Sequence, residues 1–522
     1  MIKNTKVSLL GRSLLTGSCA LVLSLAFILP HYSFIGLLGL LGLLYLLKES
    51  ETLTTKQLLV QCYFFGLVYF ALVMSWIYKI HATDLIQSSI LASLFKTITF
   101  LLVMSALAVG FVAAGFVYRK LKISLSSITI LLLPAIWILA EFGRSLFFSV
   151  FFIGPGGSVG PYWNFGSLGL VVSSTWLGYA SRLVGLYGLS FLVILSALAV
   201  FQVLCKKYSY GLLLLIPLTL SIGGYALYNQ PVGKKLQVHA VGLGPDMEQG
   251  YETKLKNQLN SLDNADLTVL PEYSYYFADS DGQPTGRSLP SETGMVIDSR
   301  SGTAQQGHRN ITTFYQANGN ILAEETKKFL IPGGEYVPYI YQAVLVASGN
   351  TDILHAVEND HGVKVGAKKE QPFLYNNVDY GALACSGAIA PNLYAGLSAQ
   401  GATVLVNSAS LSTMGISDLY YRQASQMASF IAVSNARPFV QAARGGPSYI
   451  LNKDGRTEQI LKSPKDVAFI TASVATNQQK TIYTKYGEFV LALSVGLVLA
   501  RSAKLLLKSN RTPKKLTTKK RT

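Results

Sequence analysis

Long apolar runs fill the first 230 residues of the chain and return once near its end. A run of about 20 apolar residues is long enough to cross the hydrocarbon core of a membrane as a helix. The pattern predicts about eight spans, at residues 13–30, 33–47, 58–79, 89–117, 123–141, 183–204, 210–228 and 487–507. The apolar stretch 142–182 is broken by glycines and prolines, so we expect a loop that the protein itself buries.

Between the last two spans, short apolar runs alternate with polar segments. Strands are expected at 235–243, 265–272, 294–302, 310–325, 339–349, 380–385 and 402–410, with a late hairpin at 439–456. Helical spacing marks 249–262 and 418–434. This alternation predicts a layered α/β sandwich, with its chemistry at the carboxyl ends of strands.

These patterns divide the chain into a membrane domain (1–228), an α/β domain (229–486), a final span (487–507) and a basic tail (508–522). Only 14% of the residues are charged, against about 25% in soluble proteins. Basic residues gather before the first span, in alternate loops and in the tail: Lys3, Lys6, Arg12, Lys48, Lys56, Arg119, Lys120, Lys122, Lys206, Lys207 and residues 508–522. These segments are expected to be cytoplasmic, which places both termini inside and the α/β domain outside.

The net charge of +17 raises the possibility of a nucleic-acid partner. Much of the basic excess lies in the predicted cytoplasmic segments, where it sets orientation and meets anionic lipid. No basic patch with interleaved aromatic residues is present, so we expect no nucleic-acid partner.

Cys385 is the only cysteine of the polar domain; Cys19, Cys62 and Cys205 lie in or beside spans. A disulfide at Cys385 is therefore not expected, which leaves a buried structural cysteine or a reactive thiol. Cys385 ends one expected strand, and Glu272 ends another.

Lys327 precedes a glycine-containing segment that also holds Glu335. A carboxylate, an ammonium and a thiol are the groups that acyl transfer through a thioester requires, if the fold brings them together.

Each of these residues also has a structural alternative. Lys327 and Lys328 could be a solvated pair, Glu272 could cap the next segment, and Glu335 could fix the lysine loop by hydrogen bonds. Glu141 and Arg144 could bind lipid head groups, but an interfacial ion pair at the end of a span is the preferred interpretation. Asn310-Ile-Thr forms a glycosylation sequon, to which we assign no function, and no metal-ligand spacing is present.

With these residues the chain resembles the apolipoprotein N-acyltransferases, the membrane-bound branch of the nitrilase superfamily. KKFLIPGGEYVP (327–338) is similar to the family's K-x-x-L-x-P-x-G-E-Y-x-P segment, and Pro271-Glu272 is similar to its first acidic motif. Three further stretches resemble family segments: WILAEFGRSLFF (137–148), VGLYGLSFLV (184–193) and NARPFVQAAR (435–444).

The resemblance implies a nitrilase-like α-β-β-α sandwich outside the inner membrane of a bacterium. It implies that an acyl chain moves from a phospholipid, through a cysteine thioester, to the diacylglyceryl-cysteine that begins a lipoprotein. Glu272 would be the general base, Lys327 the oxyanion stabiliser, Cys385 the nucleophile and Glu335 a supporting acid. The family needs no metal and no dissociable cofactor, and we expect a monomer among membrane lipids.

Two departures from the family pattern surround the cysteine. The family has an aromatic residue and then an acid after its cysteine, where Ser386 and Gly387 stand here. Its N-D-x-W-F-like stretch corresponds to VNSASLST (406–413), which has no Asp, Trp or Phe. Gly387 is expected to leave room for a bound acyl group. The departures keep two alternatives open: a non-catalytic homologue that binds lipid or lipoprotein, or a divergent acyltransferase or amidase with another acceptor.

Overall fold

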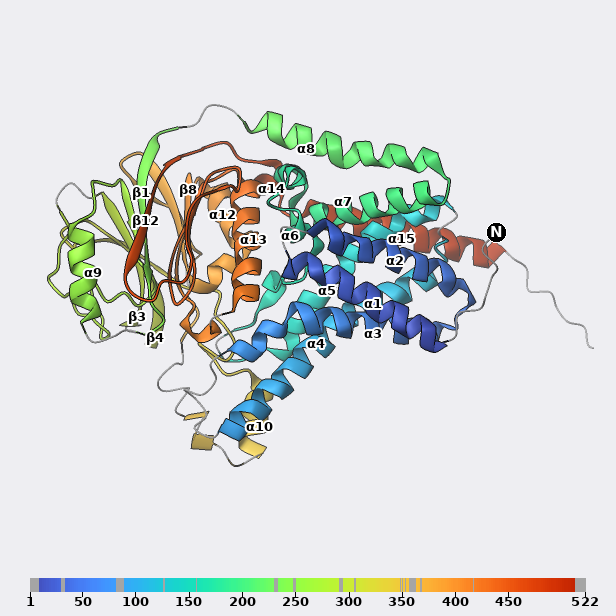
Figure 1. Cartoon of the computed structure of the whole chain (residues 1–522), viewed down its shortest axis with the longest axis horizontal. Helices are drawn as coiled ribbons and strands as arrows, with labels where there is room; N and C mark the ends of the chain where they lie inside the picture. The colour runs from blue at the N-terminus through green and yellow to red at the C-terminus, as the bar shows by residue number, and fades with distance from the viewer. Residues whose placement is uncertain are drawn as a thin grey trace, which may run out of the picture.

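The computed structural model of the chain describes residues 9–29, 33–80, 89–124, 127–155, 157–229, 233–246, 250–290, 294–304, 307–347, 349, 351–352, 354–355, 363–366, 369–415 and 417–511. Lys3, Lys6 and residues 512–522, which contribute to the predicted orientation, lie outside the described residues. The long helices occupy one end of the molecule, and the strands, with several shorter helices, occupy the other (Figure 1).

The first part of the chain is helical. Its α-helices are α1 (Leu9–Ile28), α2 (Ser33–Glu49), α3 (Thr55–Val73), α4 (Ser89–Lys120), α5 (Leu132–Phe151), α6 (Leu168–Val171), α7 (Ser181–Leu204) and α8 (Leu215–Leu227). The last helix, α15 (Phe489–Arg511), returns to pack against α5 and α7.

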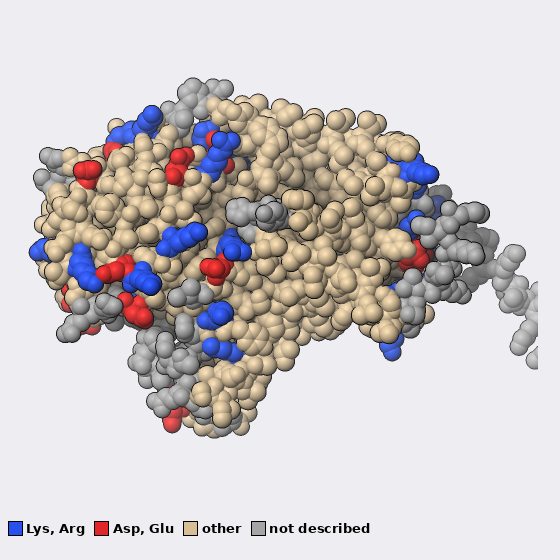
Figure 2. All heavy atoms as spheres, viewed as in Figure 1, with Lys and Arg blue, Asp and Glu red and all other residues tan. Residues whose placement is uncertain are grey.

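Seven helical segments of the described chain are long and apolar enough to cross a membrane. They are Leu10–Ile28, Thr55–Val73, Ala92–Lys120, Thr129–Phe151, Trp176–Leu204, Tyr208–Leu227 and Phe489–Lys508. The remaining predicted span, 33–47, is helix α2, whose 17 residues fall short of the roughly 20 that a span needs. Figure 2 shows charged side chains over the strands and at the opposite end of the helices, while the surface between them is almost free of charge. That uncharged band is what a membrane-embedded surface requires.

The fifth span lies later than predicted, over α5 rather than 123–141. Pro134 lies in the first turn of α5, where a proline ring is tolerated. The expected loop 142–182 is correspondingly shorter, because its first ten residues are helical. The described rest, 152–155 and 157–180, is made of turns, 3₁₀ segments and α6, and much of it is buried.

Glu141 and Arg144 do not form the interfacial ion pair that the sequence suggested. Both are buried within α5, and no ion pair joins them among the described residues. Glu141 Oε1 accepts the Leu168 N–H at 3.0 Å, and Arg144 donates to the Phe165 carbonyl at 3.1 Å. Both side chains therefore hold the buried loop against α5. These contacts form only when the loop packs on the helix.

The second part is built on strands that join in one branched hydrogen-bonded network. They are β1 (Lys235–Leu243), β2 (Leu267–Val269), β3 (Met295–Ala304), β4 (Gly307–Tyr315), β5 (Ile321–Thr326), β6 (Phe373–Tyr375), β7 (Val378–Ala384), β8 (Val404–Ser410), β9 (Phe439–Arg444), β10 (Ser448–Leu451), β11 (Thr457–Leu461) and β12 (Ala468–Ala475). The main path runs β5-β4-β3-β2-β1-β9-β8-β7-β6, and β12 adds to β1 while β10 and β11 extend from β9. The pairs β1–β2, β2–β3, β7–β8, β8–β9 and β1–β9 are parallel.

The two arms of this network pack face to face. One apolar cluster takes Val238, Val269 and Ile297 from one arm and Val406 and Val440 from the other. Outside the first arm lies α9 (Tyr251–Asn260), and outside the second lie α12 (Pro391–Gln400) and α13 (Asp418–Asn435). The predicted fold class, a helical membrane domain followed by an α-β-β-α sandwich, is confirmed.

The prediction of a strand at 339–349 is wrong. Residues Tyr339–Ala347 form helix α10. Its aromatic and β-branched composition favours strands, but tertiary contacts override that preference. Tyr341 donates a hydrogen bond to Thr99 of α4 at 3.0 Å, and its ring packs on Phe95. Leu345, one turn later, packs on the same core.

Helix α13 joins the sandwich to the membrane helices. Gln423 donates to the carbonyl of Val73, the last residue of α3, at 2.8 Å. Arg182 of α7, fully buried, donates to the Val433 carbonyl at 3.0 Å and pairs with Asp454 at 2.7 Å. The face of the sandwich that carries α12 and α13 is therefore fixed against the membrane helices (Figure 1).

Candidate active site

Glu272 follows β2 and is buried, with 2% of its surface exposed. Its Oε2 accepts the backbone N–H of Ser410, the last residue of β8, at 2.9 Å. Its Oε1 accepts the side-chain amide of Asn310 from β4. The carboxyl therefore points from one arm of the sandwich toward the other, where the cysteine lies.

Cys385 follows β7 and has the backbone angle φ of +42°, in the left-handed region that non-glycine residues rarely adopt. This conformation ends the strand abruptly at Cys385 and is a local strain that the surrounding structure must hold. The thiol lies 3.3 Å from the Ser410 carbonyl. Ser410 thus contacts the thiol with its carbonyl and Glu272 with its N–H.

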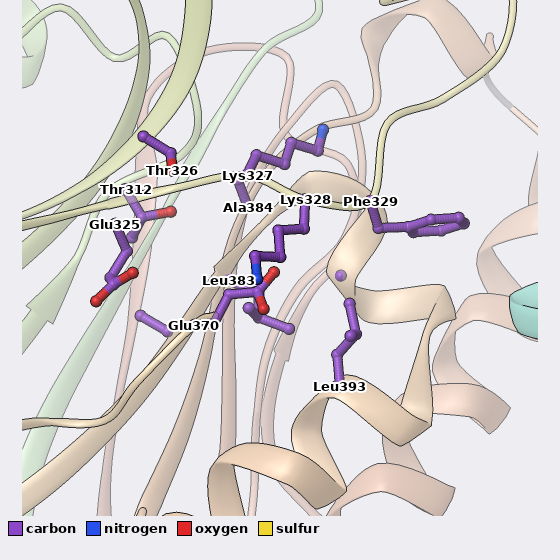
Figure 3. Close-up of a pocket in the computed structure, with 12 residues that line it drawn as sticks. Thr312, Glu325, Thr326, Lys327, Lys328, Phe329, Glu370, Leu383, Ala384 and Leu393 are labelled. Carbon is purple, nitrogen blue, oxygen red and sulfur yellow. The ribbon is translucent and has the colours of Figure 1, made fainter. Parts of the chain in front are cut away.

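Lys327 follows β5 directly and is buried, with 7% of its surface exposed. Its ammonium pairs with Glu335 Oε1 at 2.8 Å. Figure 3 shows Lys327 and Lys328 pointing to different sides of the chain, with Lys328 directed toward Glu370. The two lysines are therefore not a solvated pair.

Glu335 makes the hydrogen bonds in the lysine loop that its structural alternative expects. Its Oε2 accepts the Ile331 N–H at 2.8 Å, which closes the turn that contains Gly333 and Gly334. Its Oε1 holds the Lys327 ammonium. The carboxylate therefore fixes the loop and compensates the buried lysine.

Burial dominates the pKa values of these groups. It raises the pKa of the Cys385 thiol and of the Glu272 carboxyl, because it disfavours their charged forms. The charge of Glu272 raises the pKa of Cys385 further, and Lys327 lowers it. Burial by itself lowers the pKa of Lys327, but the charges of Glu335, Cys385 and Glu272 outweigh it and raise that pKa. The resting site therefore holds a protonated thiol beside a charged lysine.

Asn310 is a residue of this cluster to which the sequence analysis assigned no function. Its side chain is fully buried, which excludes glycosylation at the sequon. The amide nitrogen donates to Glu272 and, at 3.4 Å, to Glu335 Oε1, while the backbone carbonyl of Asn310 accepts the Lys327 backbone N–H at 2.9 Å. No local signal marks this position, because Asn310 is the first residue of the expected strand segment 310–325 and its partners lie on other segments.

A third buried carboxyl lies near Glu272, on β3. Asp298 accepts the Ser274 hydroxyl at 2.7 Å and the Ser299 N–H at 2.7 Å. Burial raises the pKa of Asp298 to about 7, and the negative charge of Glu272 acts in the same direction. Ionisation of Asp298 near neutral pH therefore opposes folding.

Aromatic side chains separate the site from the membrane helices. Tyr420 of α13 packs on Trp76, which precedes α4, with ring centroids 4.9 Å apart, and on Phe165 at 6.0 Å. Trp163 packs on both Trp76 and Phe165. The charges of Cys385 and Lys327 both influence the pKa of Tyr420, which burial raises. This wall is apolar and lies between the thiol and the bundle.

The two departures from the family pattern have structural explanations. Ser386 donates its hydroxyl to the Phe329 carbonyl, so it fastens the cysteine turn to the lysine segment. A Cβ added at Gly387 would lie 2.5 Å from the Leu383 Cβ. Gly387 therefore lets the turn pack on its own strand, and the room for a bound acyl group that we expect beside it stays a prediction.

The altered stretch 406–413 contributes to the site mainly through its backbone. Ser410 contacts the thiol and Glu272 with its main chain, and the Asn407 amide donates to the Cys385 carbonyl at 3.2 Å. The backbone contacts do not depend on the side chains that the family has there. Among the described residues, no group of His, Cys, Asp and Glu side chains is arranged to hold a metal ion.

The comparisons with known proteins agree with the motifs. Residues 19–199 match the family described as apolipoprotein N-acyltransferase N-terminal domain. The chain is 24% identical over 386 residues to apolipoprotein N-acyltransferase of Geobacter metallireducens, a match that covers 68% of this chain and 70% of that protein. The predicted resemblance to the apolipoprotein N-acyltransferases is thereby confirmed.

Two solved structures are similar to part of the chain. The glutamine-dependent NAD+ synthetase of Acinetobacter baumannii matches with a TM-score of 0.35 and 16% identity, over 48% of each chain. The chain therefore spans about half the length of that synthetase. A carbon-nitrogen hydrolase from Helicobacter pylori G27 matches with a TM-score of 0.32 and 15% identity, over 53% of this chain and 95% of that one.

Proposed function

We propose that this protein transfers a fatty acyl chain from a phospholipid, through a thioester on Cys385, to the α-amine of the diacylglyceryl-cysteine that begins a lipoprotein. The observation that carries the proposal is the Ser410 main chain, which holds the Cys385 thiol with its carbonyl and the Glu272 carboxyl with its N–H. A nucleophile and a base are thus fixed at neighbouring positions, with a buried ammonium in the same cluster.

In the first step, Glu272 takes the thiol proton as Cys385 Sγ attacks the ester carbonyl of the phospholipid. The negative charge that develops on the carbonyl oxygen is stabilised by the Lys327 ammonium, which the loop of Glu335 holds in place. The C–O bond of the ester breaks, and Glu272 returns the proton to the leaving glycerol oxygen. A thioester and a lysophospholipid result.

In the second step, the lipoprotein amine attacks the thioester carbonyl and gives its proton to Glu272. Lys327 again stabilises the oxyanion. The C–S bond breaks, the thiolate takes the proton back, and an amide remains on the acceptor. The raised pKa of Glu272 makes its carboxylate a stronger base. A stronger base takes a proton more readily from the thiol in the first step and from the amine in the second step.

The surroundings of the cluster favour lipid substrates. The buried wall formed by Trp76, Trp163, Phe165 and Tyr420 gives the cluster an apolar boundary, which suits a lipid substrate. The seven candidate spans keep the site beside a bilayer. We propose that α2 is an eighth crossing beside these seven, which returns the chain to the side on which it began. With eight crossings the basic segments fall on one side, so the protein lies in the inner membrane of a bacterium, as a monomer, with the sandwich outside and both termini in the cytoplasm.

The name of the Geobacter relative supports lipoprotein N-acylation as the general activity. A second candidate, a homologue that binds lipid or lipoprotein without chemistry, is favoured by Ser386 and Gly387, which stand where the family has an aromatic residue and an acid. The retained backbone contacts of Ser410 favour the catalytic alternative.

Incubation with a phospholipid and a synthetic diacylglyceryl-cysteine peptide distinguishes the candidates. The proposal expects the peptide to gain one acyl chain on its α-amine, and expects no gain with Cys385→Ala. A peptide that is bound but not acylated by the unmodified protein supports the non-catalytic candidate. Release of ammonia from a small amide, without acylation of the peptide, indicates an amidase.

A further inference from the structure

A second cavity lies away from the cysteine, where the sandwich meets the membrane helices. It has a volume of about 320 Å³, roughly twice that of a 150 Å³ cavity that accepts benzene. Its walls come from α5 and α7 on one side, α12 and α14 (Ile482–Tyr486) on the other, and the start of α15. Figure 1 shows α14 at this junction, beside the end of α7. The cavity is therefore placed at the expected level of the membrane surface.

Glu488 is the one charged side chain among the described residues that line this cavity. Its two oxygens accept the N–H groups of Leu186 and Tyr187 at 2.9 and 3.1 Å. Gly185, with φ of +71°, makes this approach possible, because a Cβ there would lie 2.6 Å from Glu488 Oε2. The carboxylate is thus built into the kink of α7.

Glu488 has no cationic partner among the ion pairs of the described chain. A carboxylate oxygen can accept two hydrogen bonds, so each oxygen retains one site. A partly buried carboxylate without a counter-charge, as Glu488 is here, is stabilised when a cation pairs with it. This arrangement points to a positively charged ligand group.

The remaining walls describe the rest of that ligand. Phe142 and Leu491 are apolar and belong to helices that are candidate spans. Asn392 accepts the Tyr483 hydroxyl through Oδ1 at 3.0 Å, which leaves its amide nitrogen as a donor at the cavity wall. A carboxylate, an amide donor and an apolar side match an ammonium, a phosphate and a hydrocarbon chain, respectively.

We propose that this cavity binds a phospholipid whose head group carries a primary ammonium, with the ammonium on Glu488 and the phosphate near Asn392. The bound lipid fills the junction between α7, α12 and α15 and compensates the Glu488 charge. The proposal does not depend on the thioester reaction, since the cavity and the Cys385 site are lined by different residues.

Native mass spectrometry of the purified Cys385→Ala protein tests the proposal without lipid turnover. The protein is mixed with equal amounts of phosphatidylethanolamine and phosphatidylglycerol, and retained lipid is counted after the detergent is removed in the gas phase. We expect preferential retention of one phosphatidylethanolamine, reduced at least tenfold by Glu488→Gln. The exposed Glu458→Gln serves as the charge control and should retain the lipid.

A second variant addresses the risk that Glu488→Gln disturbs α7. A Cβ at Gly396 meets no atom within 4 Å, so Gly396→Leu fills the cavity without a backbone clash. It should abolish retention, whereas Gly496→Leu, equally free of contacts but on the exposed side of α15, should not. Equal retention of both lipids, or unchanged retention in Glu488→Gln and Gly396→Leu, would overturn the proposal.

Discussion

Replacing Asn310 with alanine tests how the carboxylates of the site are controlled. The Asn310 amide is a donor to Glu272 and to Glu335, and its bond to Glu272 lowers the pKa of that carboxyl. A hydrogen bond to a charged group contributes about 1.5–3 kcal/mol. Loss of this bond should therefore raise the pKa of Glu272 in Asn310→Ala, and because about 1.4 kcal/mol corresponds to a factor of ten, the ionised fraction below that pKa should fall at least about tenfold.

The assay is the rate of Cys385 acylation by a phospholipid as a function of pH. The reaction needs ionised Glu272, so a higher pKa moves the acidic limb of the profile to higher pH. At a pH on that limb, acylation should fall at least about tenfold, and it should recover as the pH rises. A merely structural role would instead lower the rate equally at every pH.

Two further variants sharpen this test. Asn310→Asp places another carboxyl beside two acids that share one lysine, so its acidic limb should move further than that of Asn310→Ala. Asn257→Ala, an exposed position on α9, should keep the wild-type profile. An unshifted acidic limb in Asn310→Ala would refute the reasoning.

Three other predictions concern the lysine, the cysteine turn and Asp298. Lys327→Met should slow acylation at least about 100-fold, the usual effect of removing an oxyanion donor, whereas Lys328→Met should change the rate little; similar losses in both would contradict the assignment. Gly387→Ala should lower both the melting temperature and acylation, because its Cβ would meet Leu383 at 2.5 Å; unaltered values would show that the turn yields freely. The unfolded state loses the Asp298 proton at lower pH than the folded state, so stability falls between about pH 4 and pH 7, by at most about 4 kcal/mol. Asp298→Asn should remove this fall, and thermal unfolding in detergent at the two pH values checks it; a mutant that keeps the same pH dependence would contradict it.

The strand ends that carry Glu272 and Cys385 could be predicted, because parallel strands alternate with helices and place their carboxyl ends together. A contact between Glu335 and the lysine loop could also be predicted, since the motif fixes the spacing of Lys327 and Glu335. Asn310 was not, because its partners come from β2 and the lysine loop and only the folded sheet brings them together.

The errors in the helical part have a similar cause. Hydropathy located the fifth span too early, although Pro134 marked the start of the helix. Glu141 and Arg144 hydrogen-bond to the loop at 165–168. The local sequence does not show that this loop packs against α5. Helix α10 was mistaken for a strand because its packing on α4, through Tyr341, decides its conformation.

The central claim is that Cys385 carries the acyl chain as a thioester. Its most direct test is the intact mass of the purified protein after incubation with phospholipid, measured before and after hydroxylamine. The account predicts a gain of one acyl chain that hydroxylamine removes and that Cys385→Ala does not acquire. A folded, lipid-exposed protein with no such adduct, or an adduct that persists in Cys385→Ala, would contradict it.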